Sequence, residues 1–252
     1  MRSKRERGEK LLVPYLMGGM TEDWTDSLEA VVAAGADAVE VGIPFSDPMM
    51  DGPVIQEASV RALDRGATPS SVIDAVAAAD VAVPIVVMTY YNIVFRAGHR
   101  RMARSLRDAG IGAAIVPDLP LEELGDWADE ADDAGVATVL LAAPSSTPAR
   151  VKRICERCRG FVYAVGRMGV TGERTTVAAD AGIVVERVRR FTDMPVCVGV
   201  GVSTPAHAVE LCGVADGVVV GSALVRRLLE GGGPDAAAAF VKDMRGALDG
   251  GA

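Results

Sequence analysis

The sequence predicts a single-domain α/β protein, a closed (β/α)8 barrel over residues 1–252. Three observations predict it. The length of 252 residues suits one such barrel, which typically needs about 250. Short apolar runs alternate along the whole chain with segments of helical spacing, which is the pattern of parallel strands joined by helices. The apolar runs number eight, and eight βα units favour a closed barrel over an open sheet.

The expected strands are short, continuously apolar runs, as in parallel sheets that are covered on both faces. They are Leu11 to Met17, Ala38 to Gly42, Ile85 to Thr89, Ala113 to Val116, Thr138 to Ala142, Phe161 to Val165, Val196 to Gly199 and Gly217 to Val220. An open doubly wound sheet is the alternative fold. Such a sheet usually carries a G-x-G-x-x-G turn after its first strand, whereas this turn reads Gly18-Gly19-Met20.

Signals for helix starts and ends divide the chain into the same alternating strands and helices. Capping residues followed by acids or by a first-turn proline predict helix starts, and glycines after apolar-periodic stretches predict helix ends. The starts are at Thr21, Thr68, Thr147 and Thr204, and the ends are at Gly35, Gly110 and Gly135. The break at Gly231-Gly232-Gly233-Pro234 separates a short helix from a final Ala-rich helix that ends near Leu248.

Composition excludes several classes of function. Half of the residues are hydrophobic, but no apolar run reaches the roughly 18 residues that span a bilayer. The first fifteen residues lack the apolar core of a secretory signal, so we expect a cytoplasmic protein with no membrane partner. A formal net charge of -8 argues against a nucleic-acid partner. A small phosphorylated ligand stays possible, because backbone amides can bind phosphate.

Cysteines and histidines give no strong signal. Cys155 and Cys158 form a Cys-x-x-Cys pair, but flanking charged residues place it late in an expected helix. A zinc site or a redox pair needs a different context, so packed or surface thiols are the favoured interpretation. His99 and His207 lie in expected helix starts, where a capping or solvated role is typical. We therefore expect neither a metal nor a histidine-based mechanism.

Glu40 is the first candidate for chemistry. It lies between Val39 and Val41 in the second strand, and strand alternation points its side chain opposite to theirs. If the valines face the helices, Glu40 points into the barrel mouth. Burial there would raise the pKa of its carboxyl group toward values useful for proton transfer. A hydrogen-bonded structural glutamate is the alternative.

Active sites of such barrels lie at the carboxyl ends of the strands, and three loops there stand out. The loop after Glu40 contains three prolines and two acids, so it could hold Asp47 or Asp51 rigidly over the mouth. Ordinary turn aspartates are the alternative. Glycine turns after the last two strands, around Gly201 and Gly221, suit a phosphate site. The glycine-rich segment 166–173 suits a mobile lid, with a surface loop as the alternative.

These motifs together resemble the tryptophan synthase alpha subunit family over nearly the whole chain. The segment from Glu40 to Pro53 is similar to the family's signature E-[LV]-G-[IV]-P-[FY]-S-D-P-x-x-D-G-P, which is very specific. Further matches are Tyr90-Tyr91-Asn92, Pro117-Asp118-Leu119-Pro120, Gly169-Val170-Thr171-Gly172, Gly199-Val200-Gly201 and Gly221-Ser222.

The resemblance implies a TIM barrel that cleaves indole-3-glycerol phosphate to indole and glyceraldehyde 3-phosphate in tryptophan biosynthesis. It implies that Glu40 is the principal acid/base and that Asp51 holds the indole N–H. It implies substrate contacts, which fall at Tyr15, Met88, Ile115, Tyr163, Thr171, Gly172, Gly201, Gly221 and Ser222. It implies no cofactor on this chain and a pyridoxal-phosphate beta subunit as partner in an alpha2beta2 heterotetramer.

The sequence departs from the family pattern at two places. Both departures bear on contact with the beta subunit and leave the two carboxylates unchanged. Gly18-Gly19-Met20 stands where the family commonly has Gly-Asp-Pro, and the segment before Tyr15 leaves little room for the helix that usually covers the barrel bottom. Two rival functions stay open, namely a stand-alone indole-3-glycerol phosphate lyase and a weakly active barrel that mainly regulates a beta subunit. Intact Glu40 and Asp51 argue against the second rival.

Overall fold

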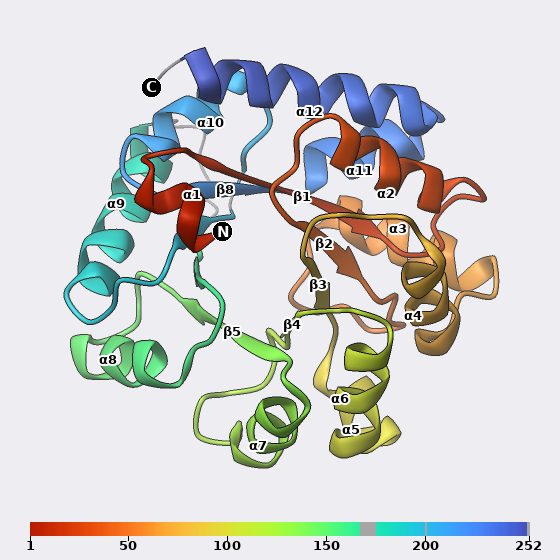
Figure 1. The fold of residues 1–252 in the computed structure, drawn as a ribbon, viewed down its shortest axis with the longest axis horizontal. Helices are drawn as coiled ribbons and strands as arrows, with labels where there is room; N and C mark the ends of the chain where they lie inside the picture. Colours follow the sequence, from red (N-terminus) through yellow and green to blue (C-terminus); the bar gives the residue numbers. More distant parts are fainter. Residues whose placement is uncertain (167–174, 200, 251–252) are drawn as a thin grey trace.

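A computed structural model of the chain, which describes residues 1–166, 175–199 and 201–250, contains a closed barrel of eight parallel strands (Figure 1). The eight strands follow one another around the barrel in chain order, as the sequence predicted. They are β1 (Leu11–Met17), β2 (Val39–Gly42), β3 (Ile85–Met88), β4 (Ala113–Ile115), β5 (Ala137–Ala142), β6 (Val162–Ala164), β7 (Val196–Val198) and β8 (Gly217–Val220). The barrel closes where β1 pairs with β8, with Leu11 opposite Gly217.

The helices surround the strands, and α12 packs along α2, α10 and α11 (Figure 1). They are α1 (Arg2–Glu6), α2 (Trp24–Ala33), α3 (Pro53–Asp64), α4 (Pro69–Ala78), α5 (Tyr91–Ala97), α6 (His99–Asp108), α7 (Gly125–Ala134), α8 (Pro148–Arg157), α9 (Thr175–Arg189), α10 (Pro205–Cys212), α11 (Ser222–Leu229) and α12 (Gly233–Gly250). Among the described residues, none of these helices is long and apolar enough to cross a membrane.

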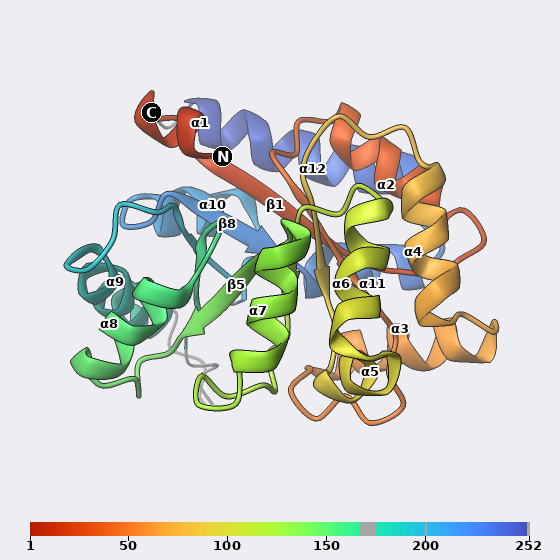
Figure 2. The same ribbon diagram turned by 60° about the horizontal axis from the view of Figure 1, so that its bottom comes forward.

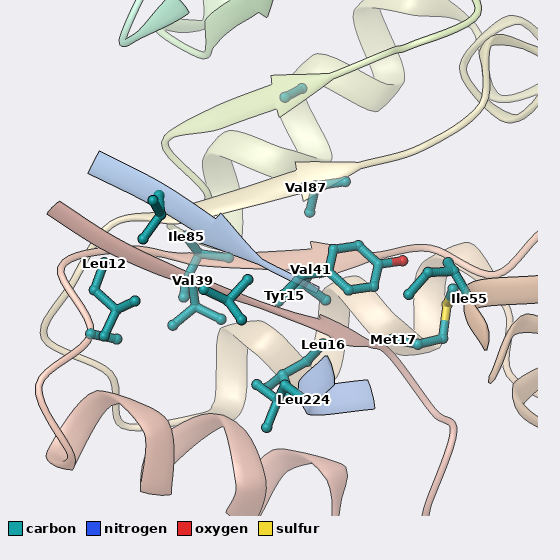
Figure 3. Close-up of a cluster of buried hydrophobic side chains, with 14 of the residues drawn as sticks. Leu12, Tyr15, Leu16, Met17, Val39, Val41, Ile55, Ile85, Val87 and Leu224 are labelled. Carbon is teal, nitrogen blue, oxygen red and sulfur yellow. The ribbon is translucent and has the colours of Figure 1, made fainter. Parts of the chain in front are cut away.

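Alternation along each strand divides the buried side chains into two cores. The outer core fills the space between strands and helices, and it includes Val39 and Val41 of β2 (Figure 3). The inner core fills the barrel and includes Leu11, Val13 and Ala38. The valines that flank Glu40 therefore face the helices, which confirms the condition on which its inward orientation depended.

Most of the predicted helix boundaries are confirmed. Thr68, Thr147 and Thr204 are N-caps whose side chains accept a backbone N–H, each followed by a proline. The predicted start at Thr21 is wrong, because α2 begins at Trp24. The preceding turn instead buries Met20 in the outer core, and the N-cap is Asp23, two residues after Thr21.

The amino-terminal ends of the strands form the barrel bottom, where a short helix lies (Figure 2). The expectation that there is little room for a helix before Tyr15 needs correction, since α1 occupies five residues there. Lys4 of α1 forms an ion pair with buried Asp37, just before β2. Arg5 lies 3.3 Å from Asp216, just before β8. Two carboxylates at the strand starts thus tie α1 to the barrel.

Candidate active site

A cavity of about 470 Å³ opens at the carboxyl ends of the strands. Its wall includes residues from β1, β2, β3, β6 and β8 and from the loops that follow them. This is the end of the barrel at which parallel strands present their loops and at which such barrels carry their chemistry. The predicted catalytic pair, Glu40 and Asp51, lies in this wall.

Glu40 projects from β2 into the cavity. Its strand neighbours are Tyr15 of β1 and Val86 of β3, and only 1% of its surface is exposed. Its Oε2 atom has no hydrogen-bond partner among the described residues. Burial, and then the negative charge of Asp51, raise the pKa of the Glu40 carboxyl group to about 8. Glu40 is therefore mostly protonated at neutral pH and can donate a proton to a bound molecule.

Asp51 lies at the end of the loop that joins β2 to α3. The hydroxyl group of Tyr90 donates a hydrogen bond of 3.0 Å to Asp51 Oδ2 and accepts one of 2.9 Å from the Met50 N–H. Burial raises the pKa of Asp51, and the hydrogen bond from Tyr90 opposes that rise. Asp47, the other acid of the loop, is exposed and is not part of the cavity wall. Of the two acids of this loop, Asp51 is the one that lies in the cavity wall.

Side-chain contacts fix this loop in addition to its prolines. The rings of Phe45 and Tyr90 stack with their centroids 5.0 Å apart. The buried Ser59 hydroxyl accepts a hydrogen bond from the Phe45 N–H and donates one to the Phe45 carbonyl. Tyr90 thus holds both ends of the segment from Phe45 to Asp51, a role that sequence reasoning missed. Its position directly after β3, at the edge of the predicted site, was the available signal.

Tyr15 and Tyr163 lie in the wall, and each packs over a glycine at the carboxyl end of the next strand. A Cβ atom on Gly42 would lie 2.0 Å from the Tyr15 hydroxyl oxygen, and one on Gly199 would lie 2.1 Å from that of Tyr163. Burial raises the pKa of both phenols well above the usual value. They are therefore neutral groups that can donate hydrogen bonds to a ligand.

The predicted phosphate cradle forms another part of the cavity wall. Gly201, after β7, has a φ of 64° that favours glycine, and Gly221 precedes Ser222, the first residue of α11. Backbone N–H groups at a helix start bind anions well. Ser203 also contributes to the wall, and sequence reasoning missed it. The cradle is separate in sequence from the carboxylates but shares one cavity with them.

The remaining predicted contacts divide into three groups. Tyr15, Met88 and Tyr163 are part of the wall. Ile115 is fully buried in the inner core and is not among the wall residues. Thr171 and Gly172, with most of the predicted lid, lie outside the described residues.

The cysteine pair does not take part in this site. Cys155 and Cys158 are buried free thiols, and Cys158 donates a hydrogen bond of 3.0 Å to the Phe161 carbonyl. Burial raises the pKa of Cys158 to about 12, which keeps it protonated and unreactive. Among residues 1–166, 175–199 and 201–250, no group of three or more His, Cys, Asp or Glu side chains could hold a metal ion.

Comparison with known proteins gives one consistent result. The family model described as tryptophan synthase alpha chain matches residues 1–245. The tryptophan synthase alpha chain of Streptomyces coelicolor is 48% identical, over 93% of this chain and 87% of its own length. A ligand-free tryptophan synthase structure from M. tuberculosis is 36% identical with a TM-score of 0.89, covering 98% of this chain and 96% of that one. The alpha subunit from Legionella pneumophila is 28% identical with a TM-score of 0.88, covering 98% and 96%.

Proposed function

The chain belongs to the tryptophan synthase alpha chain family, and on this premise we propose that Glu40 and Asp51 are its catalytic residues. The enzyme is a carbon–carbon lyase of tryptophan biosynthesis. It cleaves indole-3-glycerol phosphate to indole and glyceraldehyde 3-phosphate. The proposal for the residues rests on the buried carboxyl group of Glu40. Its Oε2 atom has no hydrogen-bond partner in the part of the chain that the structure describes, its pKa is about 8, and it shares one cavity with Asp51.

The reaction requires a proton on indole C3, stabilisation of positive charge on the ring nitrogen, and removal of a proton from the hydroxyl group next to the breaking bond. Protonated Glu40 donates its proton to C3. The Asp51 carboxylate accepts a hydrogen bond from the indole N–H and stabilises the charge that C3 protonation creates there.

The bond between C3 and the glycerol carbon then breaks, and its electron pair restores the aromatic indole. The glycerol hydroxyl group becomes the aldehyde and transfers its proton to the Glu40 carboxylate. The proton balance closes, because Glu40 ends in the protonated form in which it began. Gly201, Gly221 and Ser222 are suited to hold the phosphate during these steps.

A glyceraldehyde 3-phosphate release assay on Glu40→Gln tests the catalytic role. We expect nearly all turnover to be lost while ligand binding survives, because glutamine keeps the shape but cannot transfer the proton. Asp47→Asn is a matched control, since Asp47 lies in the same loop but outside the cavity wall. Loss of binding together with unfolding of Glu40→Gln would instead make Glu40 structural.

The chain has a tryptophan synthase beta subunit as its partner, and we propose an alpha2beta2 assembly. Met49 and Met50 are exposed by 89% and 60% in the loop that Tyr90 joins to the start of α5, and Phe95 of α5 is exposed by 63%. Exposed apolar patches often mark a contact with another protein. The Met50 N–H donates to Tyr90, which also holds Asp51, so contact with this surface can influence the catalytic loop. We propose that the beta subunit docks on Met49, Met50 and Phe95.

The assay with and without a beta subunit also separates the rival functions. A stand-alone lyase would show full activity that added beta subunit leaves unchanged, and a purely regulatory barrel would show almost none in either case.

We further propose that residues 1–252 form one domain and that the protein works in the cytoplasm. Four buried free thiols support a reducing compartment.

A further inference from the structure

Arg226 is the one basic side chain among the described residues of the cavity wall. The same wall contains the carboxyl groups of Glu40 and Asp51. A phosphate dianion is repelled by the Asp51 carboxylate, and the whole chain also carries a net charge of -8. A positive group at the cavity edge would therefore decide where a phosphorylated ligand places its charged end.

The position of Arg226 in α11 directs it toward the phosphate cradle. It follows Ser222 by four residues, so the two side chains share one face of the helix. Side chains in a helix lean toward its amino-terminal end, which here is the end that contributes Gly221 and Ser222 to the cavity. This geometry allows the long side chain of Arg226, which is exposed and belongs to the cavity wall, to reach the N–H groups at the helix start.

The neighbouring Arg227 provides a contrast on the same helix. Its guanidinium carbon lies 4.3 Å from the centroid of the Phe240 ring in α12, and its Nη1 donates a hydrogen bond of 2.7 Å to the Ala223 carbonyl. Among the described residues, Arg226 has neither kind of contact. Within the part of the chain that the structure describes, its guanidinium group has no carboxylate within 4.0 Å and no hydrogen-bond acceptor.

We infer that Arg226 binds the phosphate group of the substrate, together with the N–H groups at the start of α11. The inference rests on the proposed function, because it assumes a phosphorylated substrate in this cavity. A guanidinium group can donate two parallel hydrogen bonds to phosphate oxygens, which fixes orientation as well as position. Arg226 thus holds the phosphate at the cradle, and the indole end of the substrate points toward Glu40 and Asp51.

The test compares Arg226→Gln, Arg226→Lys and the control Arg227→Gln. For each variant, KM and kcat are measured with indole-3-glycerol phosphate, and dissociation constants are measured with glycerol phosphate and with indole as separate probes. We expect Arg226→Gln to raise KM and the glycerol phosphate dissociation constant about 10- to 100-fold, as loss of a charge-assisted hydrogen bond does. We expect kcat to change less than about threefold and indole binding to stay the same, since both depend on the carboxylate end.

The other variants complete the test. Arg226→Lys should recover part of the affinity, because it keeps the charge but not the paired hydrogen bonds, and Arg227→Gln should match the wild type. Equal effects of Arg226→Gln and Arg227→Gln would overturn the inference, since they would indicate only the loss of general positive charge. Weaker binding of indole would also overturn it. If the wild type cleaves the substrate and Arg226→Gln has normal KM, the inference alone fails, whereas a wild type without lyase activity refutes the proposed function.

Discussion

At the scale of single residues, the ionisation of Glu40 determines the pH range of the reaction. Its pKa of about 8 means that the proton donor is present below that pH and absent above it. We expect kcat/KM to fall about tenfold per pH unit above pH 8, as measured by glyceraldehyde 3-phosphate release at low substrate concentration. Asp51→Asn removes a charge that raises this pKa, so its residual activity should begin to fall at lower pH. A wild-type profile that stays flat to pH 10 would contradict the assignment of Glu40 as the acid.

Glu40 also links stability to pH. It binds its proton more tightly in the folded chain than in the unfolded chain, where its pKa is near 4.5. Rising pH therefore lowers the free energy of unfolding between about pH 4.5 and pH 8, because the buried group must ionise. Glutamine does not ionise, so the stability of Glu40→Gln relative to the wild type should increase by on the order of 4 kcal/mol between pH 5 and pH 9.

Urea unfolding at the two pH values measures this change. Glu57→Gln is the matched control, because Glu57 is exposed on α3 and the substitution removes the same charge. A stability difference for Glu40→Gln that does not depend on pH would show that Glu40 titrates normally in the folded chain.

At the scale of elements, Tyr90 joins the start of α5 to the loop between β2 and α3. Tyr90→Phe leaves both the Met50 N–H and Asp51 Oδ2 without their hydrogen-bond partner. We expect kcat/KM to fall about tenfold, which corresponds to roughly 1.4 kcal/mol of lost transition-state stabilisation. Steady-state kinetics measure the effect. The control is Tyr91→Phe, which removes a hydroxyl group that contacts His99 and not the loop; an equal loss there would mean that the Tyr90 contacts are not specific.

Sequence patterns predicted elements better than they predicted contacts between elements. Apolar runs and capping threonines identified the strands and most helix starts because both depend on local sequence. The turn before α2 was misjudged, since burial of Met20 is a tertiary contact. Strand alternation placed Glu40 only on the condition that Val39 and Val41 face the helices, and the position of Asp51 in the cavity wall involves Tyr90, which follows 39 residues later. The orientation of Arg226 into the cavity likewise required the packing of α11.

At the scale of the whole molecule, the barrel bottom contributes stability without taking part in chemistry. The Asp37 carboxylate accepts hydrogen bonds from the Leu12 N–H at 2.7 Å and from Arg245 at 3.2 Å, and it pairs with Lys4. Its side chain is only 1% exposed. We expect Asp37→Asn to lower the free energy of unfolding by about 3 kcal/mol, because Arg245, whose side chain is only 15% exposed, loses its buried counter-charge. Chemical denaturation gives this value, and kcat/KM should stay within about twofold of the wild type.

Asp249→Asn is the control for Asp37→Asn. Asp249 also pairs with Arg245, at 2.7 Å, but it is 67% exposed, so we expect its loss to cost less than about 1 kcal/mol. Equal destabilisation by the two substitutions would show that burial of Asp37 is unimportant.

The partner surface is also a property of the whole molecule. Phe95→Asp places a charge on the proposed beta-subunit surface and should weaken activation by added beta subunit, while the activity of the isolated chain stays the same. Phe191→Asp is the matched control, since Phe191 is exposed by 39% and lies between α9 and β7, before the start of a strand, whereas Phe95 follows the end of β3. Titration of beta subunit into the lyase assay measures both variants. Equal activation of both would place the contact elsewhere.

The pairing of β1 with β8 has a consequence for how the protein is made. Leu11 of β1 leaves the ribosome early, whereas its partner Gly217 is synthesised about two hundred residues later. Until then, one edge of the growing sheet offers unpaired backbone groups to other chains, which is a known route to aggregation. A nascent chain of this kind therefore depends most on chaperones, or on fast completion of synthesis, before its last strand emerges.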